Sequence, residues 1–542
     1  MNSNYISRMI QKRIPFFILL LISLFNLSCD KKTEIDDTQV FRLNRYDNIS
    51  SLDPTFARTQ ANNWVCNLMY NGLVKLSDKL EIVPDLAKSW TISADGIEYT
   101  FVLRRDVYFH KNPVFGKDST RLVNAADFEY SFQRITDPKV GGAASWVLNN
   151  VESFKAVNDS VFQIRLKEAF PPFLGLVSMK YCSVVPKEMF ANGQEEFRKH
   201  PVGTGPFQFK LWEDNIKLVL RKNPLYFEKD EKGNSLPYLE AVAMTFLPEK
   251  HSEFLELIQG NVDMMADLDP SYKNEILTPG GELNPKYSNI LDLHKYDYLS
   301  TVYLCFYLDG NEMIDERLRK AINYGIDKQK MVKYMMNGAA NVADGGFIPK
   351  GLPGFNPEAA YHYEPQKARE LIAAYRKERG ALPEIKLTSV QEYADICEYI
   401  QAQLAKIGLT IAINVVPGPT MRDGKATGKF SFFRANWGAD YPDAENFLSL
   451  YYSKNFAPEG PNYSHYKQDE FDKLYLQAFK ITDETERAKI YAEMDKLMME
   501  QAPVVPLFYD QTSIFLRKNV KNFNMSPVKL LDLTRVYKIK QE

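Results

Sequence analysis

Cysteine and histidine are both scarce in this chain, which has 5 cysteines and 6 histidines among 542 residues. No two cysteines form a CxxC pair and no two histidines form an HExxH motif, so the sequence contains no local zinc or redox signature. A GxSxG elbow and a GxxxxGK[ST] phosphate loop are missing as well. These absences favour binding over catalysis, and we expect no catalytic residue, no metal and no cofactor.

An excess of charge of either sign is also missing. The chain has 67 Lys and Arg against 69 Asp and Glu, a formal net charge of −2. Because no net positive field is available to attract phosphates, we expect no nucleic-acid partner. The chain is 45% hydrophobic and 25% charged, as soluble globular proteins are. Aromatic residues make up 13%, and such rings can fill a core or line a wet cleft.

A long apolar run is found only near the N-terminus. Residues 14–27 are apolar and follow Arg8, Lys12 and Arg13. The run is shorter than the ~20 residues that span a bilayer, so it predicts a secretory signal. Ser28 and Cys29 follow it and resemble a bacterial lipobox, which implies that Cys29 is lipidated after removal of 1–28. A plain signal peptide with an incidental cysteine is the alternative.

The mature chain begins with a charged stretch at 29–37, which we interpret as a tether. The length suggests about three or four domains. Four further cysteines are widely separated, and they form up to two disulfides or remain buried free thiols: Cys66, Cys182, Cys305 and Cys397. The sequence does not choose between these states.

Periodicity predicts a mixed α/β protein. Alternating apolar residues predict strands at 99–104 and 161–166, and a hairpin over 207–221. A helix is expected after the N-cap Asn124. Beyond residue 300 helices and strands alternate, with a long helix predicted over 317–337. Further predicted segments are helices at 61–73, 364–377, 394–407, 471–479 and 484–500, and strands at 385–388 and 410–416.

Several motifs in order along the chain resemble the family 5 extracellular solute-binding proteins of ABC transporters. The first half contains SLDP (51–54), MYNGLV (69–74), VPDLAKSW (83–90), HPVGTGPF (200–207) and LRKNPLYF (220–227). The second half contains RLRKAINYGID (317–327), WGADYPD (437–443) and QAPVVPLF (501–508). We interpret the glycines of the HPVGTGPF motif as a structural turn that tolerates positive φ.

The resemblance implies a bilobal α/β fold, in which two lobes joined by crossing strands close about a hinge. Lobe I would comprise 38–75, 196–298 and 508–542, and lobe II 299–507. An extra domain would be inserted at 76–195.

The resemblance also implies site residues. Asp440 matches an aspartate that pairs with the α-amino group of a bound peptide, since a carboxylate alone in a closed cleft is costly. Arg434 matches an arginine that faces the ligand's carboxylate, and Lys425, with Arg422, lies in a loop that can serve the same end. Trp437 and Tyr441 are candidate walls of side-chain pockets, or core residues.

The first strand, with Arg42, Leu43 and Asn44, is expected to offer backbone groups to an extended peptide. Gly438 stands where some oligopeptide binders carry a disulfide cysteine. The implied function is a lipid-anchored carrier on the periplasmic side of a bacterial membrane. It would be a monomer that is no enzyme and that delivers oligopeptides to the permease of an ABC importer. The alternatives are a different solute (a nickel chelate, an oligosaccharide, an opine or haem) or an exported hydrolase.

Overall fold

The computed structural model describes residues 37–540, apart from 141–143, 192, 267, 269–271, 311–313 and 337–338. Cys29, the apolar run before it and most of the expected tether lie outside these residues. Within the described part, no helix has both the length and the apolar character needed to cross a membrane.

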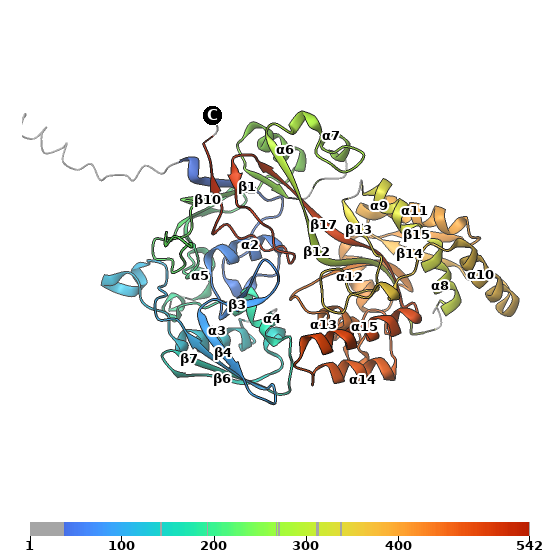
Figure 1. The fold of residues 1–542 in the computed structure, drawn as a ribbon, viewed down its shortest axis with the longest axis horizontal. Coiled ribbons are helices and arrows are strands. Elements are labelled where there is room, and N and C mark those ends of the chain that lie inside the picture. Colours follow the sequence, from blue (N-terminus) through green and yellow to red (C-terminus); the bar gives the residue numbers. More distant parts are fainter. Residues whose placement is uncertain are drawn as a thin grey trace, which may run out of the picture.

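Two long strands connect the two halves of the molecule (Figure 1). They are β12 (Leu291–Phe306) and β17 (Val504–Arg517), which pair antiparallel at the centre of an 11-stranded sheet. One side of the pair carries β11 (Met264–Ala266), β1 (Val40–Asn44), β10 (Ala241–Thr245), β9 (Lys217–Lys222) and β8 (Phe207–Glu213). The other carries β16 (Phe432–Gly438), β14 (Ile385–Ser389) and β15 (Ile411–Val415), while β13 (Ala340–Val342) pairs with β17. We call the first side lobe I and the second lobe II.

The β12–β17 ladder changes register where it passes from one lobe to the other. Residues from Leu291 to Asp297 pair in lobe I, and residues from Thr301 to Cys305 pair in lobe II, with an irregularity between Asp297 and Thr301. The lobe I half of the ladder is regular, and the lobe II half contains a second register shift between Val302 and Tyr303. The two expected crossing strands are therefore present, and the irregular step between them coincides with the junction of the lobes.

A small domain with its own sheet lies beside lobe I. Its strands are β4 (Ala87–Ile92), β5 (Glu98–Leu103), β7 (Val161–Leu166) and β6 (Val151–Asn158), in that order, and α3 (Ala125–Thr136) packs against them. In β5 every second side chain is buried, as its alternating pattern predicted. Asn124 caps α3 and forms a capping box with Asp127, which confirms the predicted start of that helix.

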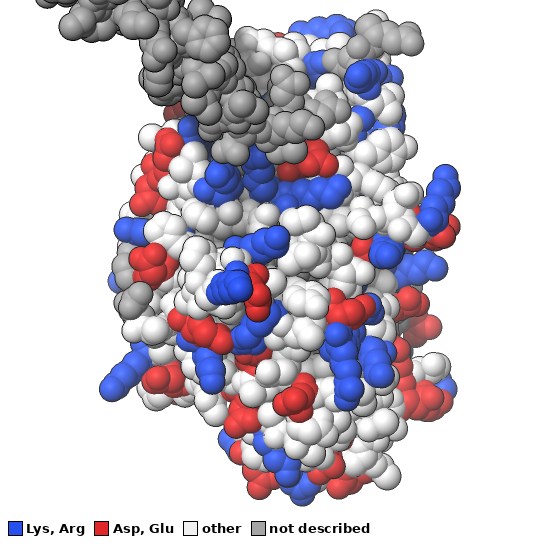
Figure 2. All heavy atoms as spheres, turned by 90° about the vertical axis from the view of Figure 1, so that its left-hand side faces the viewer, with Lys and Arg blue, Asp and Glu red and all other residues white. Residues whose placement is uncertain are grey.

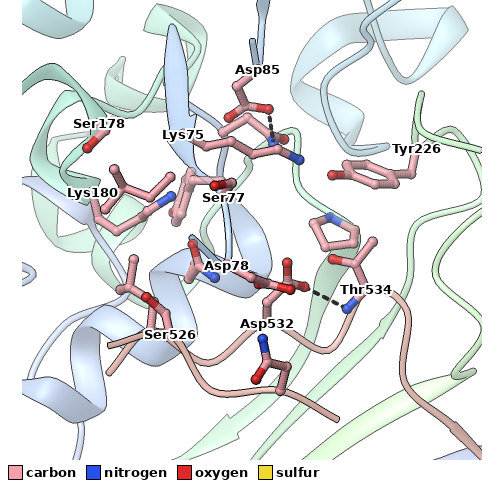
Figure 3. Close-up of a pocket in the computed structure, with 17 residues that line it drawn as sticks. Lys75, Ser77, Asp78, Asp85, Ser178, Lys180, Tyr226, Ser526, Asp532 and Thr534 are labelled. Atoms are coloured by element: carbon pink, nitrogen blue, oxygen red, sulfur yellow. Dashed lines mark hydrogen bonds between the residues drawn. The ribbon is translucent and has the colours of Figure 1, made fainter. Parts of the chain in front are cut away.

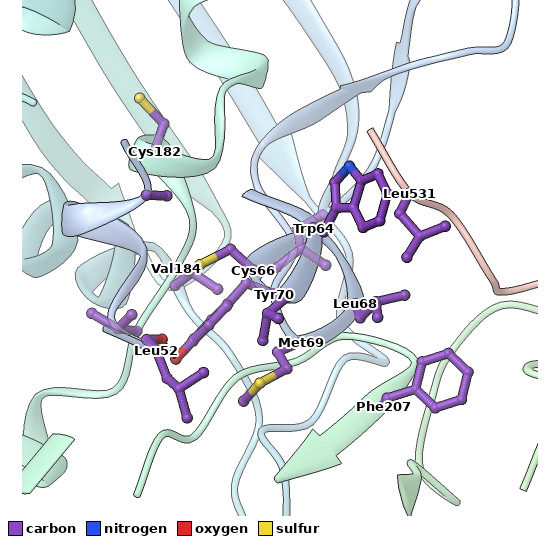
Figure 4. Close-up of a cluster of buried hydrophobic side chains, with 14 of the residues drawn as sticks. Leu52, Trp64, Cys66, Leu68, Met69, Tyr70, Cys182, Val184, Phe207 and Leu531 are labelled. Carbon is purple, nitrogen blue, oxygen red and sulfur yellow. Dashed lines mark hydrogen bonds between the residues drawn. The ribbon is translucent and has the colours of Figure 1, made fainter. Parts of the chain in front are cut away.

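The cores of lobe I and of the small domain are continuous. One cluster of buried apolar side chains extends from β1 through α2 (Gln60–Met69) to the small sheet. Figure 4 shows its part around α2, where Cys66 and Tyr70 lie beside Val184 and Trp64 lies beside Leu531. All four cysteines of the described part are buried free thiols: Cys66, Cys182, Cys305 and Cys397. Burial raises the pKa of Cys182 to about 12, so this thiol is unreactive at neutral pH.

The two glycines of the predicted turn pack against α2. Neither Gly203 nor Gly205 has a positive φ, so the expectation that these positions need glycine for a positive φ is wrong. A Cβ on Gly205 would lie 2.4 Å from the carbonyl carbon of Met69, which excludes every other residue. His110 of the small domain holds the same segment: its Nδ1 accepts from the Gly203 N–H (3.2 Å) and its Nε2 donates to the Gly205 carbonyl (2.9 Å). Burial lowers the pKa of His110 to about 4, which keeps the ring neutral.

Apolar clusters cover both faces of the lobe II sheet. The helices around it are α8 (Glu316–Gly325), α9 (Lys328–Met335), α10 (Pro365–Arg379), α11 (Ala394–Ala405), α12 (Gly418–Ala426), α13 (Glu445–Leu448), α14 (Asp469–Ala478) and α15 (Glu484–Glu500). The prediction of one helix over 317–337 is wrong. The helix ends at Gly325, and Asp327 caps a second one by accepting from the Lys330 N–H.

Charged side chains of both signs are interspersed over the face that lobe I and the small domain present in Figure 2. This distribution agrees with the near-zero net charge of the sequence.

Candidate functional site

A cavity of about 360 Å³ lies where both lobes and the small domain meet. Lobe I contributes the start of α2 and a C-terminal segment, the small domain contributes the end of α4 (Phe173–Ser178) with the residues after it, and lobe II contributes the segment after β16. The polar and charged lining residues are Arg58, Gln60, Asn63, Ser178, Lys180, Tyr181, Tyr298, Asp440 and Lys529. A site of this kind between lobes suits a solute that is enclosed when the lobes close.

Asp440 is the single acidic residue among those lining this cavity. Its segment follows β16 and is fixed by Asn446, whose Oδ1 accepts from the Asp440 N–H (3.2 Å) and from Nε1 of Trp437 (3.0 Å). The carboxylate is exposed to the cavity, and no cation of the described residues lies within 4.0 Å of it. The surrounding protein raises the pKa of Asp440 by desolvation, which hydrogen bonding from Asn446 partly offsets.

Three cations also line this cavity: Arg58, Lys180 and Lys529. Lys529 lies over the ring of Tyr298, with its Nζ 4.3 Å from the ring centroid. Within the described part of the chain, none of the three forms an ion pair within 4.0 Å. The cavity is therefore lined by one acid, on lobe II, and by three cations, on lobe I and the small domain.

Gly438 shapes the floor of the cavity. A Cβ at this position would lie 2.1 Å from the Tyr298 hydroxyl oxygen, so the phenol of Tyr298 occupies the space that any side chain here would need. Glycine at 438 thus leaves the space that the phenol of Tyr298 occupies.

Arg434 and Lys425 do not line the cavity. The guanidinium carbon of Arg434 lies 3.3 Å from the ring centroid of Tyr393, and Lys425 lies 5.1 Å from that of Tyr463. Desolvation lowers the pKa of Lys425, and the positive charges of Arg434 and Arg422 lower it further. These three residues form a separate cationic group inside lobe II.

Trp437 and Tyr441 also lie outside the cavity lining. Trp437 packs against the lobe II core. Tyr441 is only 5% exposed and belongs to the core shared by lobe I and the small domain, where it packs next to Gly175 of α4. Its hydroxyl hydrogen-bonds to Glu445. Of the two roles considered for these rings, the structure supports the core role.

The sequence predicted that the first strand offers backbone groups to a peptide, and the structure corrects this, because both edges of β1 are already paired. The Arg42 N–H donates to Oδ2 of Asp263 (2.8 Å), and the Arg42 carbonyl accepts from the Asp263 N–H (2.7 Å). The other edge of β1 is paired with β10 along its whole length. The Asn44 side chain bonds to both backbone groups of Leu247. Because β1 is an interior strand, Arg42 and Asn44 offer no free edge to a peptide.

Sequence reasoning named Asp440, which lines this cavity, but it did not name Arg58, Lys180, Tyr298 or Lys529. These residues come from four segments that are far apart in the chain, and none belongs to a motif that we identified. Only the fold brings them together, so no local pattern could have revealed them.

Comparison with known proteins identifies the family of the chain. Residues 81–458 match the family model of the bacterial extracellular solute-binding proteins, family 5. The dipeptide-binding protein of Escherichia coli is 26% identical over 483 residues, covering 85% of this chain and 87% of that protein. Heme-binding protein A of Haemophilus influenzae is 28% identical over 485 residues, covering 85% of each.

Among solved structures, the ABC transporter-associated periplasmic binding protein DppA from Helicobacter pylori, in complex with the peptide STSA, is similar with a TM-score of 0.74 and 26% identity. The match covers 92% of this chain and 98% of that one. The chain belongs to the family 5 bacterial extracellular solute-binding proteins.

Proposed function

We propose that this protein captures peptides with a free α-amino group in the cavity at Asp440 and delivers them to the permease of an ABC importer. The observation that carries the proposal is the carboxylate of Asp440, which faces a cavity between the lobes without a protein cation within 4.0 Å in the described part of the chain. A protonated amine would supply both the missing charge and the hydrogen-bond donors.

The relatives support a carrier, but their names differ in the solute. One is a dipeptide-binding protein, one a heme-binding protein, and one solved structure contains a peptide. Family membership alone therefore does not select the ligand. The charges of this cavity favour a solute that carries both an amine and an anionic group, which describes a peptide.

Membrane attachment is part of the proposal. Lipid on Cys29 would hold the monomeric carrier at the periplasmic side of a bacterial membrane, beside the permease. The charged stretch at 29–37 would give the lobes freedom to dock. No chemistry is required of the carrier, since the transporter's ATPase supplies the energy.

Calorimetric titration with trialanine and its N-acetylated form tests the amine site. We expect acetylation and Asp440→Asn each to weaken binding by about 30-fold or more, the ~2–5 kcal/mol lost when one partner of an enclosed charge pair is removed. Asp423→Asn, an exposed acid of α12, is the matched control and should bind as wild type. Equal affinity for the free and acetylated peptides would contradict the proposal, as would a haem or a nickel complex co-purified as the natural ligand.

A further inference from the structure

Tyr441 joins lobe II to the small domain. Its segment belongs to lobe II, because it follows β16, yet its ring is buried in the core that lobe I shares with the small domain. The ring lies against Gly175 of α4: a Cβ on that glycine would come 3.2 Å from the Cβ of Tyr441 and 3.6 Å from its ring. Gly175 thus leaves the recess in the small domain that receives Tyr441.

The hydroxyl of Tyr441 is held in lobe II. It donates to Glu445, the first residue of α13, whose carboxylate also accepts from the hydroxyl of Tyr475 in α14. Glu445 is buried, so the two phenols take the place of water at its carboxylate. The side chain of Tyr441 is therefore fixed at both ends, and α4 of the small domain and α13 of lobe II meet at it (Figure 1).

A second aromatic contact between the same two units lies close by. Phe170 precedes α4 in the small domain and meets Phe479, which follows α14 in lobe II, with the ring centroids 5.3 Å apart and the rings nearly perpendicular (88°). Phe479 in turn lies 4.9 Å from the ring of Tyr475, the second donor to Glu445. Lobe II therefore rests on the small domain through two ring contacts that one buried carboxylate connects.

This contact lies next to the binding carboxylate. Asp440 directly precedes Tyr441, and its N–H donates to Oδ1 of Asn446 in α13 (3.2 Å). On the other side, α4 extends from the recess at Gly175 to Ser178, which lines the cavity. The contact of Tyr441 with Gly175 thus connects two walls of the cavity, one from lobe II and one from the small domain.

We propose that Tyr441 is a positioning residue, whose ring docks lobe II on the small domain at Gly175 and so places the carboxylate of Asp440 in the cavity. The docked arrangement is the binding-competent state, and a peptide bound at Asp440 stabilises it. The apparent affinity is then the intrinsic affinity reduced by the fraction of molecules that are docked. This inference rests on the amine site of the proposed function and adds the contact that completes it.

Two substitutions remove the contact from opposite sides. Tyr441→Ala deletes the ring on lobe II, and Gly175→Val fills the recess in the small domain. Each should weaken trialanine binding by about tenfold, as it would if the docked fraction fell to about one tenth. The double variant should bind little more weakly than either single variant, because the second change acts on a contact that is already lost. Additive losses would contradict the proposal.

Tyr441→Phe and Tyr466→Phe are a matched pair, because each removes the hydroxyl of one buried tyrosine of lobe II. Tyr466 is 1% exposed and donates to Gln468 (2.6 Å) within the lobe II core. Tyr441→Phe keeps the ring but frees it from Glu445, so it should weaken trialanine binding by about threefold, the effect of one hydrogen bond. Tyr466→Phe should bind as wild type. Equal losses in the two variants would show that any buried hydroxyl of lobe II has this effect, which would overturn the specific role of Tyr441.

Small-angle X-ray scattering measures the docking of lobe II directly. Tyr441→Ala and Gly175→Val should each increase the radius of gyration of the ligand-free protein, whereas Tyr466→Phe should not. Gly175→Ala is the milder change if Gly175→Val fails to fold, and it should act in the same direction. An unchanged radius and an unchanged affinity in Tyr441→Ala would overturn the role of Tyr441 and leave the amine site standing. Equal affinity of wild-type protein for free and N-acetylated trialanine would instead overturn the amine site, and the scattering of the ligand-free variants would still decide the role of Tyr441.

Discussion

The cavity at Asp440 has a polar neighbour, a chamber of about 60 Å³ between lobe I and the small domain (Figure 3), and Lys180 lines both spaces. The two spaces differ in whether their charged side chains have partners within the protein. In the chamber, Lys75 meets Glu228, and Asp85 is hydrogen-bonded by Asn71 and Gly72. In the cavity, Asp440 and the facing cations have no ion pair within 4.0 Å in the part of the chain that the structure describes. The two spaces share lining residues and therefore lie in the same part of the fold. The difference in charge pairing comes from the individual side chains and not from the location.

This difference separates structural charges from binding charges. A buried carboxylate that the protein itself satisfies contributes to the folded state, whereas one left unsatisfied depends on another molecule. Burial raises the pKa of both Asp85 and Asp440, so the pKa direction alone does not distinguish them. Their exposure does: Asp85 is 2% exposed, whereas Asp440 is exposed and lines the cavity.

Asp85→Ala is expected to have the largest effect, and the effect should be on stability. Asp85 is 2% exposed, and its removal leaves the Gly72 N–H and the Asn71 amide without an acceptor. Each unsatisfied buried donor costs about 1–3 kcal/mol, so the free energy of unfolding should fall by about 3 kcal/mol. Urea unfolding followed by circular dichroism measures this change.

Asp532→Ala is the matched control, because this acid is exposed and lines the same chamber. Its effect should stay below about 0.5 kcal/mol. If Asp85→Ala left the free energy of unfolding unchanged and weakened peptide binding as strongly as Asp440→Asn, the conclusion that Asp85 is a structural charge would be wrong.

Much of the fold was predictable because its signals are local. The alternation at 99–104, the N-cap Asn124 and the hairpin over 207–221 depend on residues close in sequence, and each is present. The break at Ile326 was missed because the apolar spacing of α8 continues into α9 with little change. The capping by Asp327 was the available signal.

The site was predictable only where one segment carries it. Asp440 belongs to the WGADYPD motif at 437–443, so the resemblance to the family could point to it. The role expected for Arg42 depended on whether β1 lies at an edge or inside the sheet, and the pairing of β1 with Asp263 and β10 is a long-range contact. The cations that line the same cavity were hidden for the same reason, since only the fold brings their segments together with that of Asp440.

Affinity should depend on pH through Asp440 by at most about tenfold per pH unit. The pKa of this carboxyl is raised in the free protein, and a bound amine favours its charged form and lowers that pKa. Affinity is therefore fully present above the raised pKa and declines as the pH falls through it toward the pKa of the complex. Titration calorimetry of trialanine across this acidic range measures the slope.

Asp440→Asn provides the control for this pH dependence, because an amide does not titrate. Its residual affinity should show only the shallower dependence that comes from the ligand's own carboxyl group. An unchanged slope in the variant would assign the titration to another group. The variant should also unfold no more easily than wild type, since it removes an uncompensated charge and not a satisfied one.

Gly438→Ala should have the smallest effect, about 1 kcal/mol or roughly fivefold in affinity. Its Cβ would lie 2.1 Å from the Tyr298 hydroxyl oxygen, so the phenol must swing aside and reshape the wall of the cavity, while the chamber is untouched. Gly418→Ala is the matched control, because a Cβ there meets nothing closer than 3.9 Å. Adding Tyr298→Phe to Gly438→Ala removes the atom that overlaps most and should recover part of the lost affinity, a coupling that a double-mutant cycle measures. If the two changes are additive, Tyr298 does not transmit the effect of position 438, and the cavity wall is set by other contacts.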